Sequence, residues 1–162
     1  MQFSKSTGYA LHTLVRLAHA ERGLNVGIKE LSTFLGVSET YLSKIMSKLR
    51  QDGIVRAVTG ASGGYELARA ADQITFLEVI QVVEGRQHLY ECFNINENRH
   101  QLFFEAEALE PDNSHHLGSK ECLVKKVMKG AELHMHEYLQ QHTIQWVLDS
   151  ASFDCNDAVN KK

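Results

Sequence analysis

The sequence predicts a mainly α-helical fold with a small β wing: a winged helix-turn-helix followed by a long C-terminal dimerisation helix. Three observations predict it. Apolar side chains recur at helical spacing within residues 9–51, a glycine-rich hairpin follows at residues 54–68, and helical spacing returns after residue 122. With 162 residues, 43% of them apolar, the chain is long enough to bury one compact core.

A helix-turn-helix is predicted after a first helix over residues 9–19. A short helix over residues 29–35 ends at Gly36, because glycine readily adopts the left-handed conformation that stops a helix. Ser38 is a natural N-cap for the next helix, which ends near Asp52. The apolar side chains that these two helices are expected to bury are Ile28, Leu31, Phe34, Leu35, Leu42, Ile45, Met46 and Leu49.

The outward face of the second of these helices carries short polar side chains and long cations. They are Glu39, Thr40, Ser43, Lys44, Ser47 and Lys48. Hydroxyl groups bond to phosphate oxygens or base edges, and Lys neutralises phosphate. A solvated helix face accounts for the same residues equally well, so this face alone leaves both interpretations open.

The next segment is predicted to be a β hairpin. Residues 54–59 are β-branched and roughly alternating, residues 60–64 form a glycine-rich turn, and residues 65–68 return. A hairpin directly after such a helix is a wing, whose glycines let the backbone approach DNA closely. A phosphate loop is the alternative, but the Gly-Lys-Ser/Thr ending that positions nucleotide phosphates is missing. Helix, helix and wing in this order predict a DNA-binding domain over residues 1–85.

The charge distribution agrees with DNA binding. Residues 1–70 carry nine Lys and Arg against five Asp and Glu, a net charge of +4, whereas residues 71–162 carry eight against fifteen, a net charge of −7. A basic half is suited to phosphates. A winged helix that binds only protein stays open. Added salt separates the two, because DNA binding through Lys44, Lys48 and Arg56 weakens steeply with salt.

Beyond the wing, a packing helix and a loop are expected. Thr75 and Glu78 form a capping box, which opens a helix that ends at Gly85. Residues 86–121 are polar and are predicted to be a long sensor loop, with a short helix at residues 101–109.

Residues 122–150 are predicted to form the dimerisation helix, continuous from Cys122 to about Leu148, with a flexible tail at residues 151–162. Its apolar seam has the spacing of helix-on-helix packing and consists of Val124, Met128, Ala131, Met135 and Tyr138. Such a seam can serve the chain's own core. A helix this long after a completed winged domain is instead expected to pack on a second copy.

Three segments carry a resemblance to a known family: Tyr9-Ala10-Leu11, Tyr41-Leu42 with Leu49, and the wing at residues 60–65. Together with Ile74-Thr75 and Val83-Glu84-Gly85, they resemble the Rrf family of bacterial winged helix-turn-helix transcription regulators (IscR/NsrR/RsrR/CymR-like). The resemblance is close over residues 1–85 and loose over residues 122–148. It implies a homodimer that binds a palindromic operator in double-stranded DNA and acts as a repressor.

The same resemblance implies which residues bind DNA. Those expected at the major groove or its phosphates are Ser38, Thr40, Tyr41, Ser43 and Lys44, with Lys48 beside them. Those expected at the wing tip are Thr59, Ala61, Ser62 and Gly63. Many members of the family carry an arginine where this chain has Thr59. Its absence puts strong readout of the minor groove in doubt.

An iron–sulfur cluster is the first candidate for the sensed signal. Family members that sense iron, nitric oxide or redox state use three closely spaced cysteines in the sensor loop, but here the loop has only Cys92 and Cys122. The resemblance implies His12 as a further metal ligand, and imidazole ligation of a cluster is chemically sound. The fourth ligand stays unassigned, because Gly8 stands where a relative has an acidic residue.

Three other interpretations of the sensor loop stay open. Cys92 and Cys122 could form a disulfide as a thiol switch. Histidines such as His100, His115 and His116 could bind a divalent metal. The cysteines could also be inert, with a partner protein supplying the signal.

The sequence argues against an enzyme and against a membrane or secreted protein. It has no Gly-x-Ser-x-Gly, His-Glu-x-x-His or phosphate-loop motif. No apolar run is long enough to span a membrane, and residues 1–5 do not resemble a secretory signal. Three cysteines are few and odd in number, which argues against a secreted disulfide framework, so a cytoplasmic location is expected.

Overall fold

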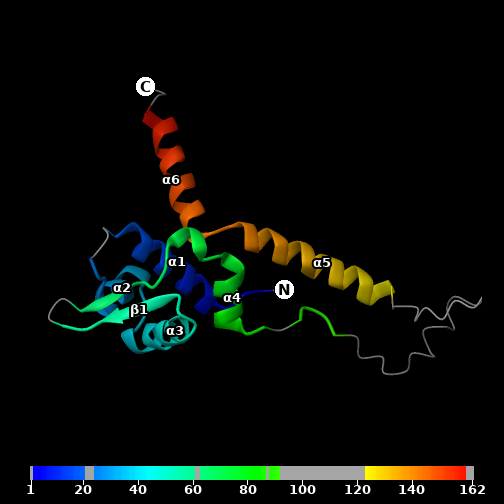
Figure 1. Ribbon diagram of the computed structural model, residues 1–162, viewed down its shortest axis with the longest axis horizontal. Helices are drawn as coiled ribbons and strands as arrows, with labels where there is room; N and C mark the ends of the chain where they lie inside the picture. The colour runs from blue at the N-terminus through cyan, green and yellow to red at the C-terminus, as the bar shows by residue number, and fades with distance from the viewer. Residues whose placement is uncertain (1, 21–23, 61–62, 87, 92–122, 160–162) are drawn as a thin grey trace, which may run out of the picture. The chain divides into compact units, whose positions relative to one another are not determined.

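The structure is a computed structural model that describes residues 2–20, 24–60, 63–86, 88–91 and 123–159 (Figure 1). It divides into two compact units, one made of residues 1–87 and 136–162 and the other of residues 88–135. In chain order the elements are α1 (Lys5–His19), α2 (Ile28–Leu35), α3 (Glu39–Gln51), β1 (Val55–Val58), β2 (Gly64–Leu67), the 3₁₀ turn η1 (Ala71–Gln73), α4 (Phe76–Glu84), α5 (Leu123–Gln141) and α6 (Ile144–Val159). This mainly helical chain with one small antiparallel sheet confirms the predicted fold class.

The core of the first unit forms where the apolar faces of its helices meet. The largest side chains with almost no exposed surface are Leu14, Leu31, Leu42, Met46, Leu49, Ile54, Ile74 and Ile144. Burying one such side chain stabilises a fold by about 1.5–3 kcal/mol. Helices α2 and α3 pack the predicted faces against the core, where Ile28 and Leu35 are partly buried, with one exception. Phe34 was expected in the core but is 59% exposed, so that prediction was wrong.

The turn between α2 and α3 has the predicted chemistry. Gly36 adopts the left-handed conformation, with φ +66°, and ends α2. The hydroxyl of Ser38 accepts a hydrogen bond from the backbone N–H of Tyr41 at 3.2 Å. A cap of this kind contributes about 1 kcal/mol to helix stability. Together the glycine stop and the serine cap fix the direction in which α3 leaves α2.

β1 and β2 form the predicted wing, with Val58 paired to Gly64. A third segment, not predicted from the sequence, joins them. The backbone of Val26 exchanges two hydrogen bonds with Tyr65, at 3.0 and 2.9 Å. This pairing requires glycine at position 64, where a Cβ atom would lie 2.7 Å from the backbone oxygen of Val26. The wing is thereby attached to the chain that enters α2.

The C-terminal region contains two helices, so the prediction of a single helix over residues 122–148 was wrong. α5 ends at Gln141, and a separate helix, α6, begins at Ile144. The tail expected to be flexible from residue 151 is helical as far as Val159. Residues 136–162 also belong to the same unit as residues 1–87, so the helical region is not one element beyond a finished winged domain.

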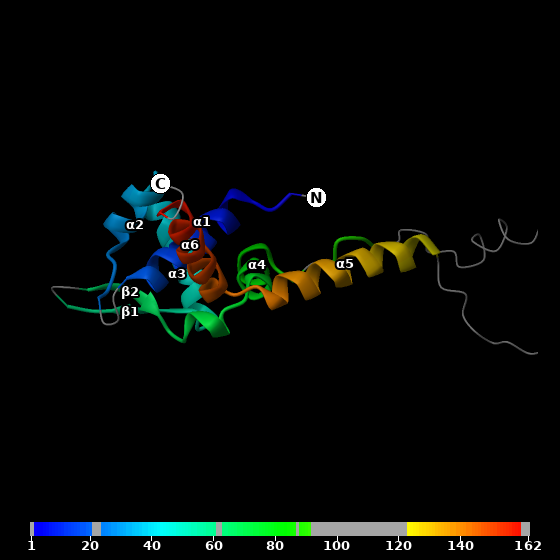
Figure 2. The same cartoon turned by 90° about the horizontal axis from the view of Figure 1, so that it is seen from above.

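Backbone pairing explains the break between α5 and α6. The N–H of Ile144 donates a 3.0 Å hydrogen bond to the carbonyl of Ile74, and Thr143 forms a β-bridge with Thr75. The Ile144 side chain is fully buried in the core of the unit. Because this strand-like pairing and helical hydrogen bonds exclude each other, one helix must end and another must start. α6 then lies beside α1 (Figure 2).

Of the second unit, the structure describes residues 88–91 and the beginning of α5. Nδ1 of His88 lies 3.2 Å from Oε1 of Glu132, whose side chain is largely buried. The short helix predicted at residues 101–109 lies outside the described residues. None of the helices that the structure describes is long and apolar enough to cross a membrane.

Candidate nucleic-acid interface

The N-terminal half of α3 exposes the polar face predicted from the sequence. Ser38, Thr40, Ser43 and Lys44 are all exposed. The side chain of Lys44 makes no hydrogen bond or ion pair with any residue that the structure describes, so its ammonium group is available to an external anion. This part of the helix therefore presents hydroxyl groups and one uncommitted positive charge to solvent.

Tyr41 lies on the same helix but is held in place by α1. Its hydroxyl is 2.7 Å from the hydroxyl of Ser6. Its ring packs edge-on against the ring of Tyr9, with the centroids 5.9 Å apart and the planes at 88°. Edge-to-face pairs of this kind stabilise by about 0.5–1.5 kcal/mol beyond the area they bury. The position of the Tyr41 hydroxyl is consequently fixed by two contacts with α1.

Lys48 makes a contact within the protein that its spacing does not predict. Its Nζ atom donates a 2.8 Å hydrogen bond to the backbone carbonyl of Val83, in the last turn of α4. Carbonyl groups in the last turn of a helix lack a partner within the helix, and a lysine there also meets the favourable end of the helix dipole. The ammonium group of Lys48 thus joins α3 to α4.

Glu84, which ends α4, joins that helix to α1. Its Oε1 atom accepts a 2.7 Å hydrogen bond from the backbone N–H of Ser4 and a second one from the hydroxyl of Thr7. The hydrogen bond from Thr7 lowers the pKa of Glu84 below its ordinary 4.5, against the opposing effect of burial. The bonds from Ser4 and the nearby charge of Lys48 act in the same direction. Glu84 is therefore ionised at neutral pH.

A hollow of about 220 Å³ lies among these helices on the side of the α3 polar face. It is lined by Ser6, Tyr41, Lys44, Ile45, Lys48 and Val83. None of these lining residues is acidic, and four of them carry a hydroxyl or an ammonium group. The hollow brings Ser6 from α1 next to predicted DNA-binding residues of α3, which helical spacing within α3 could not reveal.

The wing presents two of its four predicted contact residues within the described chain. Thr59 and Gly63 are exposed, whereas Ala61 and Ser62 lie outside the described residues. The backbone is tightly turned here, because a Cβ atom at Gly63 would lie 2.7 Å from the carbonyl oxygen of Val58. Arg56 on β1 forms a 2.7 Å ion pair with Glu66 on β2, which reduces its availability to a phosphate.

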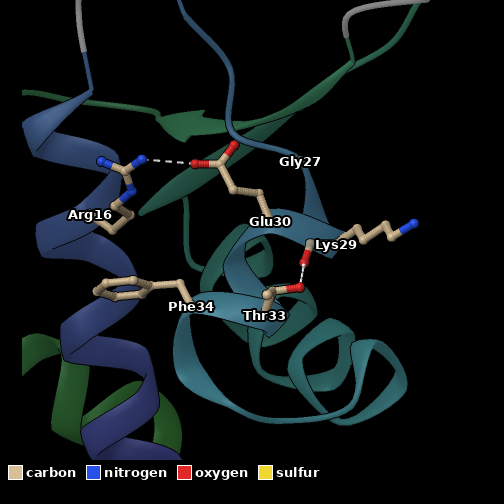
Figure 3. A pocket seen from close by; sticks show the side chains of 6 residues that line it. All are labelled: Arg16, Gly27, Lys29, Glu30, Thr33 and Phe34. Atoms are coloured by element: carbon tan, nitrogen blue, oxygen red, sulfur yellow. Dashed lines mark hydrogen bonds and ion pairs between the residues drawn. The ribbon is translucent and has the colours of Figure 1, made fainter.

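A larger hollow, of about 710 Å³, opens between α1 and α2 and contains none of the predicted site residues (Figure 3). It is lined by Arg16, Gly27, Lys29, Glu30, Thr33 and Phe34. Arg16 and Glu30 form an ion pair at 2.8 Å across it. The exposed ring of Phe34 lines this opening and does not enter the core.

His12 is the one predicted metal ligand that lies among the described residues. It is exposed on α1, and its ring bonds to no other described residue, so the imidazole is available as a ligand. Gly8, one helical turn earlier, is also exposed and has open space around it. Cys92 and Cys122 lie outside the described residues, as do His100, His115 and His116. Within the part of the chain that the structure describes, no three His, Cys, Asp or Glu side chains gather as a metal site.

Several known proteins are similar to this chain. A family model described as Rrf2, iron-dependent transcriptional regulator, matches residues 3–150. Protein aau3 of Rhizobium meliloti is 37% identical over 97 residues, which cover 60% of this chain and 62% of that protein. The regulator NsrR of Bacillus licheniformis is 28% identical over 148 residues, 91% of this chain and 92% of that protein. The regulator IscR of Cereibacter sphaeroides is 41% identical over 86 residues, which cover 52% of this chain and 56% of that protein.

The chain thus spans less than two thirds of the length of aau3 and of that IscR, but nearly all of NsrR. Among solved structures, CymR, the global cysteine regulator of B. subtilis, superposes with a TM-score of 0.66 at 23% identity, covering 93% of this chain and 98% of CymR. IscR of T. potens gives a TM-score of 0.65 at 24% identity, covering 93% and 88%. These structural likenesses show the shared fold.

The family match covers most of the chain and agrees with the winged-helix architecture. Its members are transcriptional regulators, which confirms the prediction that the chain is not an enzyme. The chain belongs to the Rrf2 family of winged-helix transcriptional regulators.

Proposed function

We propose that this protein is a homodimeric, sequence-specific DNA-binding transcription regulator that acts as a repressor. The observation that carries the proposal is the exposed polar face of α3 directly before the wing. In winged helix-turn-helix proteins the second helix enters the major groove, where hydroxyl groups bond to base edges and lysines neutralise phosphates. The position of the chain in a family of transcription regulators supports the proposal.

Sequence readout is assigned to Ser38, Thr40 and Ser43, and phosphate contact to Tyr41 and Lys44. Lys48, which is predicted from the sequence to bind DNA, is assigned mainly to positioning because its ammonium group bonds to Val83. At the wing, Thr59, Ala61, Ser62 and Gly63 are assigned to the neighbouring groove. Short side chains and glycine allow a close approach there, but they supply no long cation to a narrow minor groove.

The apolar face of α5 supports a homodimer. Val124, Val127 and Tyr138 are 57%, 70% and 63% exposed, which is unusual for large apolar side chains of a stable helix. A second copy of α5 would cover the face that includes the predicted seam at Val124 and Tyr138. Two-fold symmetry then requires an operator with half-sites about one DNA turn, or 10 base pairs, apart.

Selection of bound fragments from sheared genomic DNA tests this function and yields the operator. Wild-type protein should enrich a palindromic sequence, and Ser43→Ala should lose preference at particular bases of it. Loss of preference follows because a missing base contact changes specificity, whereas a missing phosphate contact weakens all sequences alike. Capture of no DNA by the wild-type dimer would contradict the proposal.

For the sensed signal we propose an iron–sulfur cluster held by Cys92, Cys122 and His12. The description of the family as iron-dependent and the uncommitted, exposed imidazole of His12 support this assignment. When bound, a cluster would supply a group whose charge and stability change with redox state or with nitric oxide. The second candidate is cluster-free: a disulfide switch between Cys92 and Cys122, or a signal from a partner protein.

The visible absorption spectrum of protein purified without oxygen separates these candidates. Bands above about 400 nm with stoichiometric iron and sulfide are expected for a cluster. Cys92→Ala, Cys122→Ala and His12→Ala should then each reduce the colour. His19→Ala is a matched control, because His19 is also an exposed histidine of α1. Colourless, iron-free protein from cells that build clusters would favour the thiol switch or the partner protein.

A further inference from the structure

The hollow between α1 and α3 has the chemistry of an oxyanion site. Two hydroxyl groups, from Ser6 and Tyr41, and two ammonium groups, from Lys44 and Lys48, line it. The Glu84 carboxylate, at the end of α4, is bonded to Ser4 and Thr7 and does not line the hollow. A negatively charged ligand would therefore meet donors and positive charge without a facing carboxylate.

The two hydroxyl groups leave a donor for such a ligand. Their oxygens are 2.7 Å apart, so one hydroxyl donates to the other and keeps no proton for a third group. The hydroxyl that accepts still has its own proton to donate. The ring of Tyr41 is held edge-on against Tyr9, and its hydroxyl is bonded to that of Ser6, so this hydroxyl pair is positioned before any ligand arrives. A preorganised donor loses little entropy on binding.

The charge for the site comes from Lys44. It lies three residues after Tyr41, so helical geometry puts both side chains on the same face of α3. Its ammonium group makes no bond to any described residue, unlike that of Lys48, which is bonded to the Val83 carbonyl. One of the two lysines is thus open to a ligand, and the other stays with the protein.

We propose that this hollow seats one phosphate group of the DNA backbone, held jointly by Ser6, Tyr41 and Lys44. This inference rests on the proposed DNA-binding function and deepens it, because it adds a residue of α1 to the interface. Bonds to the DNA backbone set the position of a protein on the duplex and carry no sequence information. The seat would therefore fix where α3 lies along the groove, while Ser38, Thr40 and Ser43 read the bases.

The test uses the full-length protein and a mixed-sequence duplex of about 30 base pairs, long enough for two half-sites one turn apart. Ser6→Ala and Tyr41→Phe should each weaken binding about tenfold, equally for duplexes of unrelated sequence. Ser150→Ala is the matched control, since it removes a hydroxyl from α6 that bonds only to the carbonyl of Trp146 among described groups. Its affinity for the duplex should equal that of the wild type.

A double variant separates a shared phosphate from a purely structural role. If Tyr41 and Lys44 hold the same phosphate, Tyr41→Phe combined with Lys44→Gln should cost less than the product of the two single losses. Independent, multiplicative losses would overturn the shared seat. A lowered melting temperature in Ser6→Ala and Tyr41→Phe with unchanged duplex affinity would also overturn it.

Two further outcomes are distinct. If the hollow binds a free anion, inorganic phosphate at constant ionic strength will raise the melting temperature of the wild type but not of Ser6→Ala, while their duplex affinities stay equal. That result overturns the assignment to DNA. If the wild type binds no duplex at all, the proposed function fails, whereas unaffected variants of a DNA-binding wild type overturn the seat alone.

Discussion

The ammonium group of Lys48 donates a hydrogen bond to the backbone carbonyl of Val83 at 2.8 Å, and this bond joins α3 to the end of α4. Lys44, one turn earlier on the same helix, bonds to no described residue. Two lysines that look equivalent in the sequence therefore differ in what they are available to do. The difference has a direct consequence for DNA binding.

Salt dependence should distinguish the two lysines. Each neutralised phosphate contributes about −0.9 to the slope of log Kobs against log salt concentration. A homodimer carries two copies of Lys44, so Lys44→Gln should make this slope shallower by about 1.8, whereas Lys48→Gln should leave it unchanged and lower the free energy of unfolding by about 1 kcal/mol. Fluorescence anisotropy at several salt concentrations measures the slope. Equal changes of slope in both variants would contradict the separation of roles.

The Glu84 contact with Ser4 and Thr7 should appear in the pH dependence of stability. Because the folded state lowers the pKa of Glu84, the ionised group stabilises the fold above its ordinary 4.5, and this contribution is lost as pH falls through the lower folded value. Glu84→Gln should thus be less stable than the wild type at pH 7, and the gap should narrow in acid. Urea unfolding at a series of pH values measures it. Glu91→Gln, at an exposed glutamate, is the control, and a gap independent of pH would contradict the prediction.

Two glycine substitutions should have opposite effects on stability. At Gly64 a Cβ atom would lie 2.7 Å from the Val26 oxygen, so Gly64→Ala must displace backbone and should destabilise by about 1–3 kcal/mol. Gly8 lies within α1 with open space around it, and Gly8→Ala should stabilise by about 0.5–1 kcal/mol because alanine loses less entropy in a helix. Thermal unfolding of both variants checks the signs. An unchanged or raised melting temperature in Gly64→Ala would refute the close approach of Val26 to the wing.

Short-range patterns predicted the parts of this fold that depend on neighbouring residues. The stop at Gly36, the cap at Ser38 and the capping box at Thr75 each involve groups within a few positions, and all three are present. The capping box is incomplete in one respect, since the carboxylate of Glu78 bonds to Arg69 instead of returning to Thr75. Local patterns predict where the helix starts, but they do not predict that Arg69 binds the Glu78 carboxylate in place of the Thr75 backbone.

Long-range pairings could not be predicted in this way. The Val26–Tyr65 bridge, the Ile144–Ile74 hydrogen bond and the Ser6–Tyr41 pair join positions far apart in the chain, and no periodicity connects their sequences. The apolar seam of α5 does not continue past Tyr138, because His142 and Gln145 occupy its next positions. The hydroxyl of Thr143 also accepts a hydrogen bond from the N–H of Trp146, as a helix N-cap does. The sequence thus held a local signal for the break between α5 and α6, which helical spacing over residues 122–148 did not reveal. The prediction of the candidate site suffered most from the unpredicted long-range pairings, because Ser6 lies next to Tyr41 only in the folded chain.

Ile144 tests whether the C-terminal segment is part of the first unit's core. Its side chain is fully buried, and truncating such a side chain typically costs about 2–5 kcal/mol. Ile144→Ala should lower the stability of the winged helix. Hydrogen exchange measures this as reduced protection of the backbone amides of Leu42 and Leu49. Trp146→Ala, two positions later but 51% exposed, should have a much smaller effect. Unchanged protection in α3 after Ile144→Ala would show that the segment packs elsewhere.

The exposed seam of α5 should control the oligomeric state. Val124→Glu places a charge on the face proposed to meet a second copy, and burying an unpaired carboxylate there is strongly unfavourable. The variant should sediment as a monomer and bind duplex DNA more weakly, since two half-sites can no longer be engaged together. Lys126→Glu, which introduces the same side chain on the opposite face of the helix, should remain dimeric. A monomeric wild type, or a Val124→Glu protein that stays dimeric, would mean that this seam covers part of its own chain.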